Sequence, residues 1–167
     1  MSEQLFWELI EHAWKAVPEL NNFRQDVHAT LHAGKEQFEA KYADEEPVIP
    51  AEEHLFQHLE SSLQSLSKED LQAFDRILAQ KLYDLDRSDV HEYTDGSDDG
   101  FLYCRGFIVA MGKAYYDAVN QDPSLAMFDW ACEEMTYVSM HIYEDRFGAM
   151  PKFEISRETG SNSEGWA

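Results

Sequence analysis

Residues 97–112 read SDDGFLYCRGFIVAMG, and the fold class follows from this stretch and the segments on either side of it. Ser97 is a favoured helix N-cap residue, and Asp98 and Asp99 place negative charge in the first turn, at the positive end of the helix dipole. Apolar residues then recur at helical spacing from Phe101 to Val119. The pattern predicts one long helix that begins after the serine and ends before the next proline.

Helical periodicity continues on both sides of this stretch. The pattern predicts one helix after Ser2 and, after an interruption at Pro18, a second that begins near Asn21 or Asn22. A third helix spans Leu55–Leu66, and a fourth begins after Ser67. The last helix runs from about Leu125 to Phe147, with a break near Asp129 as an alternative. Asp44–Pro50 (DEEPVIP) combines two prolines with three acids and is predicted to be a loop. Gly106 and Gly112 fall inside the central helix, where glycine indicates the close approach of another group.

The sequence therefore predicts an all-α, single-domain bundle of five to seven helices over residues 1–149. No strand-like alternation of useful length interrupts the helical pattern. Residues 150–167 carry no period, so we expect an irregular tail that is extended or loosely docked. A length of 167 residues with 44% hydrophobic residues suits one folded domain.

Charge is the most unusual property of the composition. Thirteen Lys and Arg residues stand against 33 Asp and Glu residues, which gives a net charge of -20. A field of this sign repels phosphate backbones and anionic lipid, so we expect no binding to nucleic acid or to a membrane surface. It favours a basic protein partner or a cation, although the same charge also serves solubility alone.

The two cysteines, Cys104 and Cys132, each lie in an apolar segment of helical period and outside any zinc-binding pattern. We expect buried thiols and no cofactor. The first residues lack the basic and apolar regions of a secretory signal, and no stretch approaches the roughly 20 apolar residues of a membrane span. These patterns are typical of a cytoplasmic protein.

Candidate binding residues cluster at the predicted start of the central helix. Asp95, Asp98 and Asp99 could offer carboxylate oxygens to Ca²⁺ or Mg²⁺, with the hydroxyl of Ser97 beside them. Their spacing differs from that of an EF-hand, and acids in a first helical turn also stabilise the helix dipole without any metal. The pattern leaves both interpretations open and assigns no metal ligand.

Arg105 is the fourth candidate, because an arginine on a largely apolar helix must be paired or must reach solvent. Asp75, Asp98 and Asp99 are the acids that we expect as its partners. One interpretation is an anion or carboxylate anchor in a cleft beside Gly106. The other is a buried ion pair that fixes how two helices dock.

Several segments of the chain are similar to one known family. They are residues 66–75 (LSKEDLQAFD), the stretch 97–112, residues 6–10 (FWELI), residues 122–126 (DPSLA) and the late Gly165–Trp166. Their Ser-Asp-Asp-Gly-Phe start, Arg-Gly-aromatic step and later Gly resemble a bacterial family known as domain of unknown function 4240. Cys104 stands where that family usually has an aromatic residue. The resemblance implies a shared fold, and it brings no established activity, partner or catalytic residue.

Three functional hypotheses of different classes follow. The first is a non-catalytic acidic interaction protein that binds a basic protein partner, for example an immunity or antitoxin-type inhibitor of a basic toxin. The second is an acidic mimic of nucleic acid. The third is a metal-dependent or small-molecule-binding enzyme centred on Asp98, Asp99 and Arg105. The sequence contains no nucleophile elbow and no Gly-rich phosphate loop after a strand, so no motif supports catalysis.

Overall fold

The computed structural model describes residues 1–33, 35–42, 49 and 52–167. These residues form helices and irregular segments without a β-strand, which confirms the prediction of an all-α fold. In chain order the elements are α1 (Glu3–Ala16), α2 (Pro18–Ala33), α3 (Lys35–Tyr42), α4 (Glu52–Gln64), α5 (Lys68–Asp84), α6 (Ser88–His91), α7 (Asp98–Ala110), α8 (Lys113–Gln121), the 3₁₀ turn η1 (Pro123–Leu125) and α9 (Glu133–Phe147). Along the described part of the chain, no helix is both long enough and apolar enough to span a bilayer.

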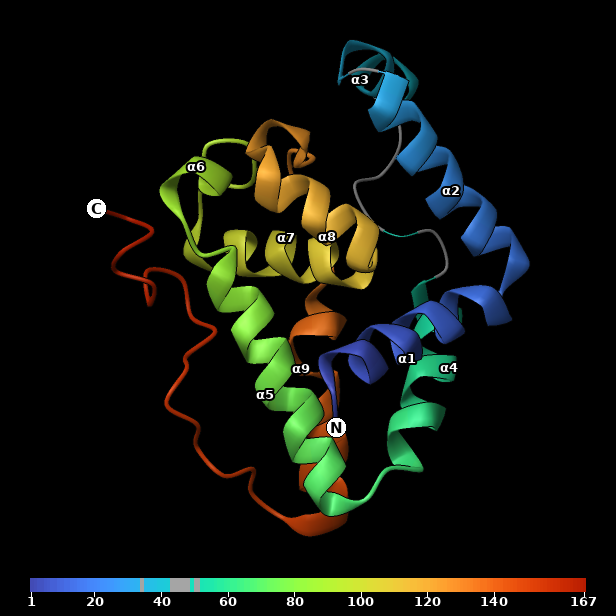
Figure 1. Ribbon diagram of the computed structural model, residues 1–167, viewed down its shortest axis with the longest axis vertical. Helices are drawn as coiled ribbons and strands as arrows, with labels where there is room; N and C mark the ends of the chain where they lie inside the picture. Colours follow the sequence, from blue (N-terminus) through green and yellow to red (C-terminus); the bar gives the residue numbers. More distant parts are fainter. Residues whose placement is uncertain (34, 43–48, 50–51) are drawn as a thin grey trace.

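Three helices form the centre of the fold. α9 packs against both α7 and α5, so the central motif helix lies beside the last helix of the chain. α1 and α4 pack against each other on one side of this group, and α2 packs on α1, buries Val27 in the core and leads to α3 (Figure 1). The predicted loop Asp44–Pro50 lies outside the described residues, apart from Ile49, whose side chain is buried in the core.

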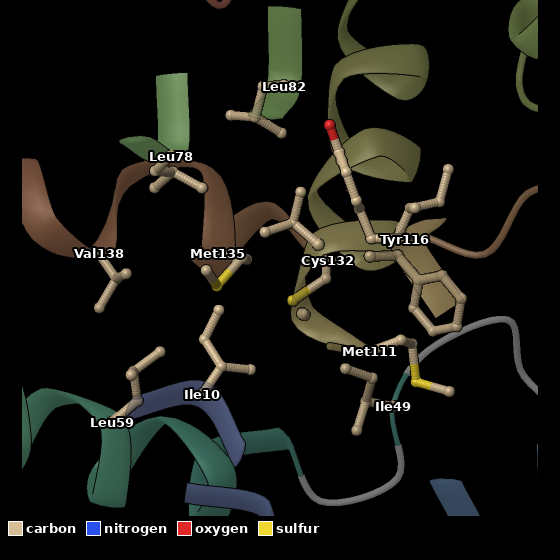
Figure 2. Close-up of a cluster of buried hydrophobic side chains, with 14 of the residues drawn as sticks. Ile10, Ile49, Leu59, Leu78, Leu82, Met111, Tyr116, Cys132, Met135 and Val138 are labelled. Atoms are coloured by element: carbon tan, nitrogen blue, oxygen red, sulfur yellow. The ribbon is translucent and has the colours of Figure 1, made fainter. Parts of the chain in front are cut away.

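Apolar side chains from several helices meet in one core. Figure 2 shows Ile10 of α1, Leu59 of α4 and Met135 of α9 in the same cluster. A buried polar contact adds to it, because the indole Nε1 of Trp14 donates a hydrogen bond of 2.7 Å to the carbonyl of Ala110. A buried indole N–H needs an acceptor, so this bond fixes α1 relative to the end of α7.

Three predicted helix starts are confirmed by their caps. The hydroxyls of Ser2, Ser67 and Ser97 each accept a hydrogen bond from the backbone N–H three residues later, at 3.2, 3.1 and 3.1 Å. Each hydroxyl satisfies one of the N–H groups that a helix start leaves without a partner. At these three positions, a serine followed by helical periodicity was sufficient to predict the start of the helix.

The predicted central helix is two helices, α7 and α8. The chain turns at Gly112, whose φ of 93° lies in the left-handed region that favours glycine. A Cβ at Gly112 would lie only 2.6 Å from Oε1 of Glu11 and 3.0 Å from Nη1 of Arg24. The apolar period continues through the turn because both helices bury a face in the same core, and this continuity explains why one helix was predicted.

Two other helix boundaries in the structure differ from the predicted ones. Pro18 is the first residue of α2 and not an interruption before it, because the fixed φ of proline suits the first helical turn. The last helix begins at Glu133 and not near Leu125. The alternative of a break near Asp129 is confirmed, because an irregular segment with Asp129 at a φ of 64° precedes the helix. Gly148 ends this helix with a φ of 83°, in the left-handed conformation that favours glycine.

The tail, residues 150–167, contains no helix and runs back beside α5 toward α6 (Figure 1). The guanidinium of Arg76 in α5 lies 4.9 Å from the centre of the Phe153 ring. Beyond that point the tail is attached by hydrogen bonds to buried carboxylates, which bring it to the candidate residues on α7.

Candidate functional site

The three acids singled out from the sequence lie around the start of α7. The hydroxyl and the backbone N–H of Ser97 donate to Oδ1 of Asp95 at 2.5 and 2.6 Å and lower the pKa of this carboxyl. Asp98 and Asp99 are exposed in the first turn of the helix. A Cβ at Gly100 would lie 2.2 Å from Oδ1 of Asp95, so the glycine leaves room for this cap. Within the described ranges, no group of three or more His, Cys, Asp or Glu residues is placed to hold a metal ion.

Arg105 lies apart from these acids and is completely buried. Its Nη1 donates to the carbonyl of Leu82 at 2.9 Å, and its Nη2 donates to the hydroxyl of Thr159 at 3.0 Å. The guanidinium also lies 4.7 Å from the centre of the Phe101 ring. Burial lowers the pKa of Arg105 to about 10, and the negative charge of Asp86 opposes this effect.

The partners expected for Arg105 were therefore wrong. In the described part of the chain its acceptors are a carbonyl and a hydroxyl, and Asp98 contributes only its backbone carbonyl, which accepts from Thr159 at 2.7 Å. Asp75 is bound to Arg157 of the tail. The acid whose charge acts most strongly on Arg105 is Asp86, which the sequence pattern did not single out.

Arg105 also completes the end of α5. The last carbonyls of this helix accept hydrogen bonds from three side chains: Leu82 from Arg105, Tyr83 from Asn162 and Asp84 from Arg87. Positive charge and N–H donors are favourable at a helix C-terminus, where the final carbonyls have no partner within the helix. Arg105 thus fixes the docking of α7 against α5, and this supports the structural interpretation of the residue.

Asp86 is the second buried charge in this region, with 0% exposure. Its carboxylate accepts hydrogen bonds from four tail groups: the N–H of Gly160 (3.0 Å), the hydroxyl of Ser161 (3.3 Å), the N–H of Asn162 (2.9 Å) and the indole of Trp166 (2.9 Å). Buried carboxylates are stable only when they are paired or hydrogen-bonded. The tail therefore satisfies Asp86.

A separate open groove of about 780 Å³ lies between α1 and α8. Its lining residues are Glu3, Gln4, Trp7, Glu8, Glu11, Lys113, Ala114 and Asp117. Ala114 is exposed in this lining, whereas Trp7 is only 4% exposed, and the charged groups consist of four carboxylates and one lysine. This combination of an apolar floor with an acidic rim is suited to a ligand that carries both apolar and cationic groups.

The rim carboxylates differ in their neighbours. Three of them have cations: Glu3 contacts Lys81 at 2.9 Å, Glu11 contacts Arg24 at 2.7 Å and Asp117 contacts Lys113 at 2.6 Å. Glu8 accepts a hydrogen bond of 2.8 Å from the neutral amide of Gln4 and forms no ion pair with any described residue. Glu8 is therefore the rim carboxylate best placed to receive a cation from a partner.

Sequence reasoning did not identify this groove. Its signal was present in α1, where positions 3, 7 and 11, together with 4 and 8, share one helical face that carries acids around Trp7. The α8 side could not be found, because Lys113 and Asp117 were assigned to the continuation of a single long helix. The turn at Gly112 is what brings α8 beside α1.

The fold and the groove together define an all-α, acidic protein with an open groove at its surface. A family model described as "Protein of unknown function (DUF4240)" matches residues 41–145, and the chain belongs to this family. The expected resemblance is thereby confirmed. No curated protein and no solved structure matches the chain significantly.

Proposed function

We propose that this protein is a non-catalytic binding protein that takes a basic segment of a protein partner into the groove between α1 and α8. The observation that carries the proposal is the groove itself, with Trp7 in its lining and a rim of four carboxylates and one lysine. An inhibitor of a basic toxin, of the immunity or antitoxin type, is one concrete form of such a protein.

The chemistry of the groove suits lysine and arginine side chains. Their aliphatic stems can cover the apolar part of the groove lining around Ala114, while their charged ends reach the rim. Glu8 offers a carboxylate without a cation, and the exposed oxygens of Glu3 and Asp117 lie on the same rim. The overall charge of -20 attracts a basic partner from a distance and raises the rate of association.

The test compares a groove variant with a matched surface variant. Glu8→Lys reverses one charge in the groove, and Glu144→Lys makes the same change at an exposed position on α9, outside the groove lining. Tagged wild-type protein and both variants are used to capture proteins from the native cell lysate at low salt and at roughly 0.5 M salt, where surface charges are screened. Captured proteins are identified by mass spectrometry, and the affinity of the purified partner is measured by calorimetry.

We expect a basic protein that is captured by the wild type and by Glu144→Lys and is lost at high salt. Its Kd should rise at least about tenfold for Glu8→Lys, which corresponds to about 1.4 kcal/mol. A partner of acidic character, or one that binds both variants equally, would contradict the proposal. Capture that does not weaken with salt would also contradict it.

A further inference from the structure

The place where the tail meets the core has the features of a binding site for a peptide. We name it the tail site and define it by four residues. Asp86 lies in the segment after α5, His91 lies in α6, and Phe101 and Arg105 lie in α7. Its occupant is the continuous segment 157–166 of the same chain.

Polar recognition in the tail site is directed at this segment. Every hydrogen bond that the Asp86 carboxylate accepts from a described residue comes from residues 160–166. Thr159 bridges the site, because its hydroxyl accepts from Arg105 and donates to the carbonyl of Asp98. Two of the four groups bound to Asp86 are backbone N–H groups, so the site recognises the path of a peptide main chain as well as its side chains.

Aromatic recognition comes from the indole of Trp166. Its ring centre lies 5.1 Å from that of His91 and 5.9 Å from that of Phe101, with the rings inclined to each other. The carbonyl of Gly165 accepts a backbone hydrogen bond of 2.9 Å from Ser88. A Cβ at Gly165 would lie 2.8 Å from the carbonyl oxygen of Asp86, so only glycine fits beside the tryptophan.

The connection between the last helix and this segment is irregular. Residues 149–156 follow Gly148 at the end of α9 and contain no helix, so the segment can leave the tail site without unwinding α9. None of the contacts in the site depends on which copy of the chain supplies the segment. Exchange of an identical element between two copies preserves every contact at low cost.

We propose that the tail site is a peptide-binding site, and that besides its own tail it accepts the same segment from a second copy of this chain. The probe for the test is a fluorescein-labelled synthetic peptide with the sequence of residues 157–167, RETGSNSEGWA. The full-length chain is used with its own tail loosened by Trp166→Ala. Gly165→Ala is a second loosened variant, and both substitutions leave every core residue of the site intact.

Binding is followed by fluorescence anisotropy, and hydrogen exchange reports the state of the tail and of the helices. We expect faster exchange at the tail amides of residues 160–162 in both variants, with α5 and α7 still protected. The peptide should bind both variants at least about tenfold more tightly than it binds the wild type, because the attached tail competes at a high effective concentration. A peptide carrying Trp166→Ala should bind at least about tenfold more weakly than the native peptide.

Asp86→Asn combined with Trp166→Ala should also lose the peptide, because the buried carboxylate accepts four donors from the segment. Three outcomes would overturn the proposal. They are failure of the native peptide to bind the loosened variants, equal binding of the native and the Trp166→Ala peptides, and a tail that remains protected from exchange in both loosened variants. The peptide comparison stays decisive even where the Asp86→Asn chain does not fold.

Discussion

Arg157 of the tail donates from Nη2 to both carboxylate oxygens of Asp75, at 2.9 and 2.8 Å, across 82 positions of sequence. The hydroxyl of Ser139 donates to the same carboxylate at 2.8 Å, and the carbonyl of Thr136 accepts from Nη1 of Arg157. The side chains of Asp75 and Arg157 are only 2% and 12% exposed. One buried carboxylate thus joins α5, α9 and the tail.

Replacing Asp75 should destabilise the fold strongly. Asp75→Ala leaves the largely buried Arg157 without its counter-ion, so we expect the free energy of unfolding to fall by about 3 kcal/mol. Urea denaturation followed by circular dichroism measures this loss. The control is Asp89→Ala, which breaks the exposed ion pair with Arg87 and should cost less than about 1 kcal/mol. Equal losses in the two variants would show that the Asp75 pair has no special role.

Gly106 should not tolerate even a methyl group. A Cβ there would lie 2.4 Å from the carbonyl oxygen of Cys132 and 2.8 Å from Cγ2 of Thr136, so Gly106→Ala forces α7 and α9 apart. We expect a loss of about 2 kcal/mol despite the better helix propensity of alanine. Gly96→Ala is the control, because a Cβ at Gly96 has no atom within 4 Å, and it should change stability by less than about 0.5 kcal/mol. A neutral Gly106→Ala would contradict the close packing of these helices.

Arg105 should stabilise the fold through its hydrogen bonds as well as by filling volume in the core. Arg105→Ala removes the donors to Leu82 and Thr159 and opens a cavity, so we expect a loss of about 4 kcal/mol in thermal or urea unfolding. Arg105→Met keeps most of the volume and should lose about 2 kcal/mol, which is the part due to the unsatisfied acceptors. If Arg105→Met were as stable as the wild type, the guanidinium would not be needed to dock α7 on α5.

Alkaline pH should lower the free energy of unfolding, because burial keeps several thiol and phenol groups neutral in the folded chain. Burial raises the pKa of Cys104 from 9.0 to about 11, and it also raises the pKa of Cys132, Tyr115 and Tyr116. These groups ionise more readily in the unfolded chain, so stability is fully present below pH 9 and is lost as the pH rises through about 11. Urea titrations across this window should show the decline, and Cys104→Ala should reduce it. A stability that is constant across the window would contradict the prediction.

Burial should also slow the reaction of the two cysteine thiols with reagents in solution. Both cysteines are free and buried, and the thiolate is the reactive form, so the folded chain should react with a thiol reagent only as fast as it opens. Labelling should become rapid in urea. Immediate labelling of one thiol in the folded protein at neutral pH would contradict the burial of that cysteine.

Local signals predicted local features correctly. Serine caps and the helical period depend on residues within one or two turns, and the structure confirms the helix starts after Ser2, Ser67 and Ser97. The sequence also indicated a close approach at Gly106, although it could not say that the neighbour is Cys132, the residue before α9. The turn at Gly112 was missed because apolar periodicity reports burial, and burial continues on both sides of the turn.

Partners of the buried charges could not be predicted, for a physical reason. The chain contains 33 acidic residues, and no local signal says which distant donor Asp75 or Asp86 will meet. Their partners come from distant parts of the chain: Arg157 lies 82 positions after Asp75, and the donors to Asp86 lie 74 to 80 positions after it. Only the three-dimensional path of the tail brings Arg157 to Asp75, while Arg105 donates to the carbonyl of Leu82.

The hydrogen bond from Trp14 to Ala110 shows that the limits of the family match differ from the limits of the folded core. The family match covers residues 41–145, whereas the indole that satisfies the last turn of α7 comes from α1, and Arg157 and the four donors to Asp86 come from residues 157–166. A recombinant fragment cut at the limits of the family match would expose the core faces that α1 covers. The segment by which relatives are recognised is therefore shorter than the segment that must be produced to obtain a folded, soluble sample.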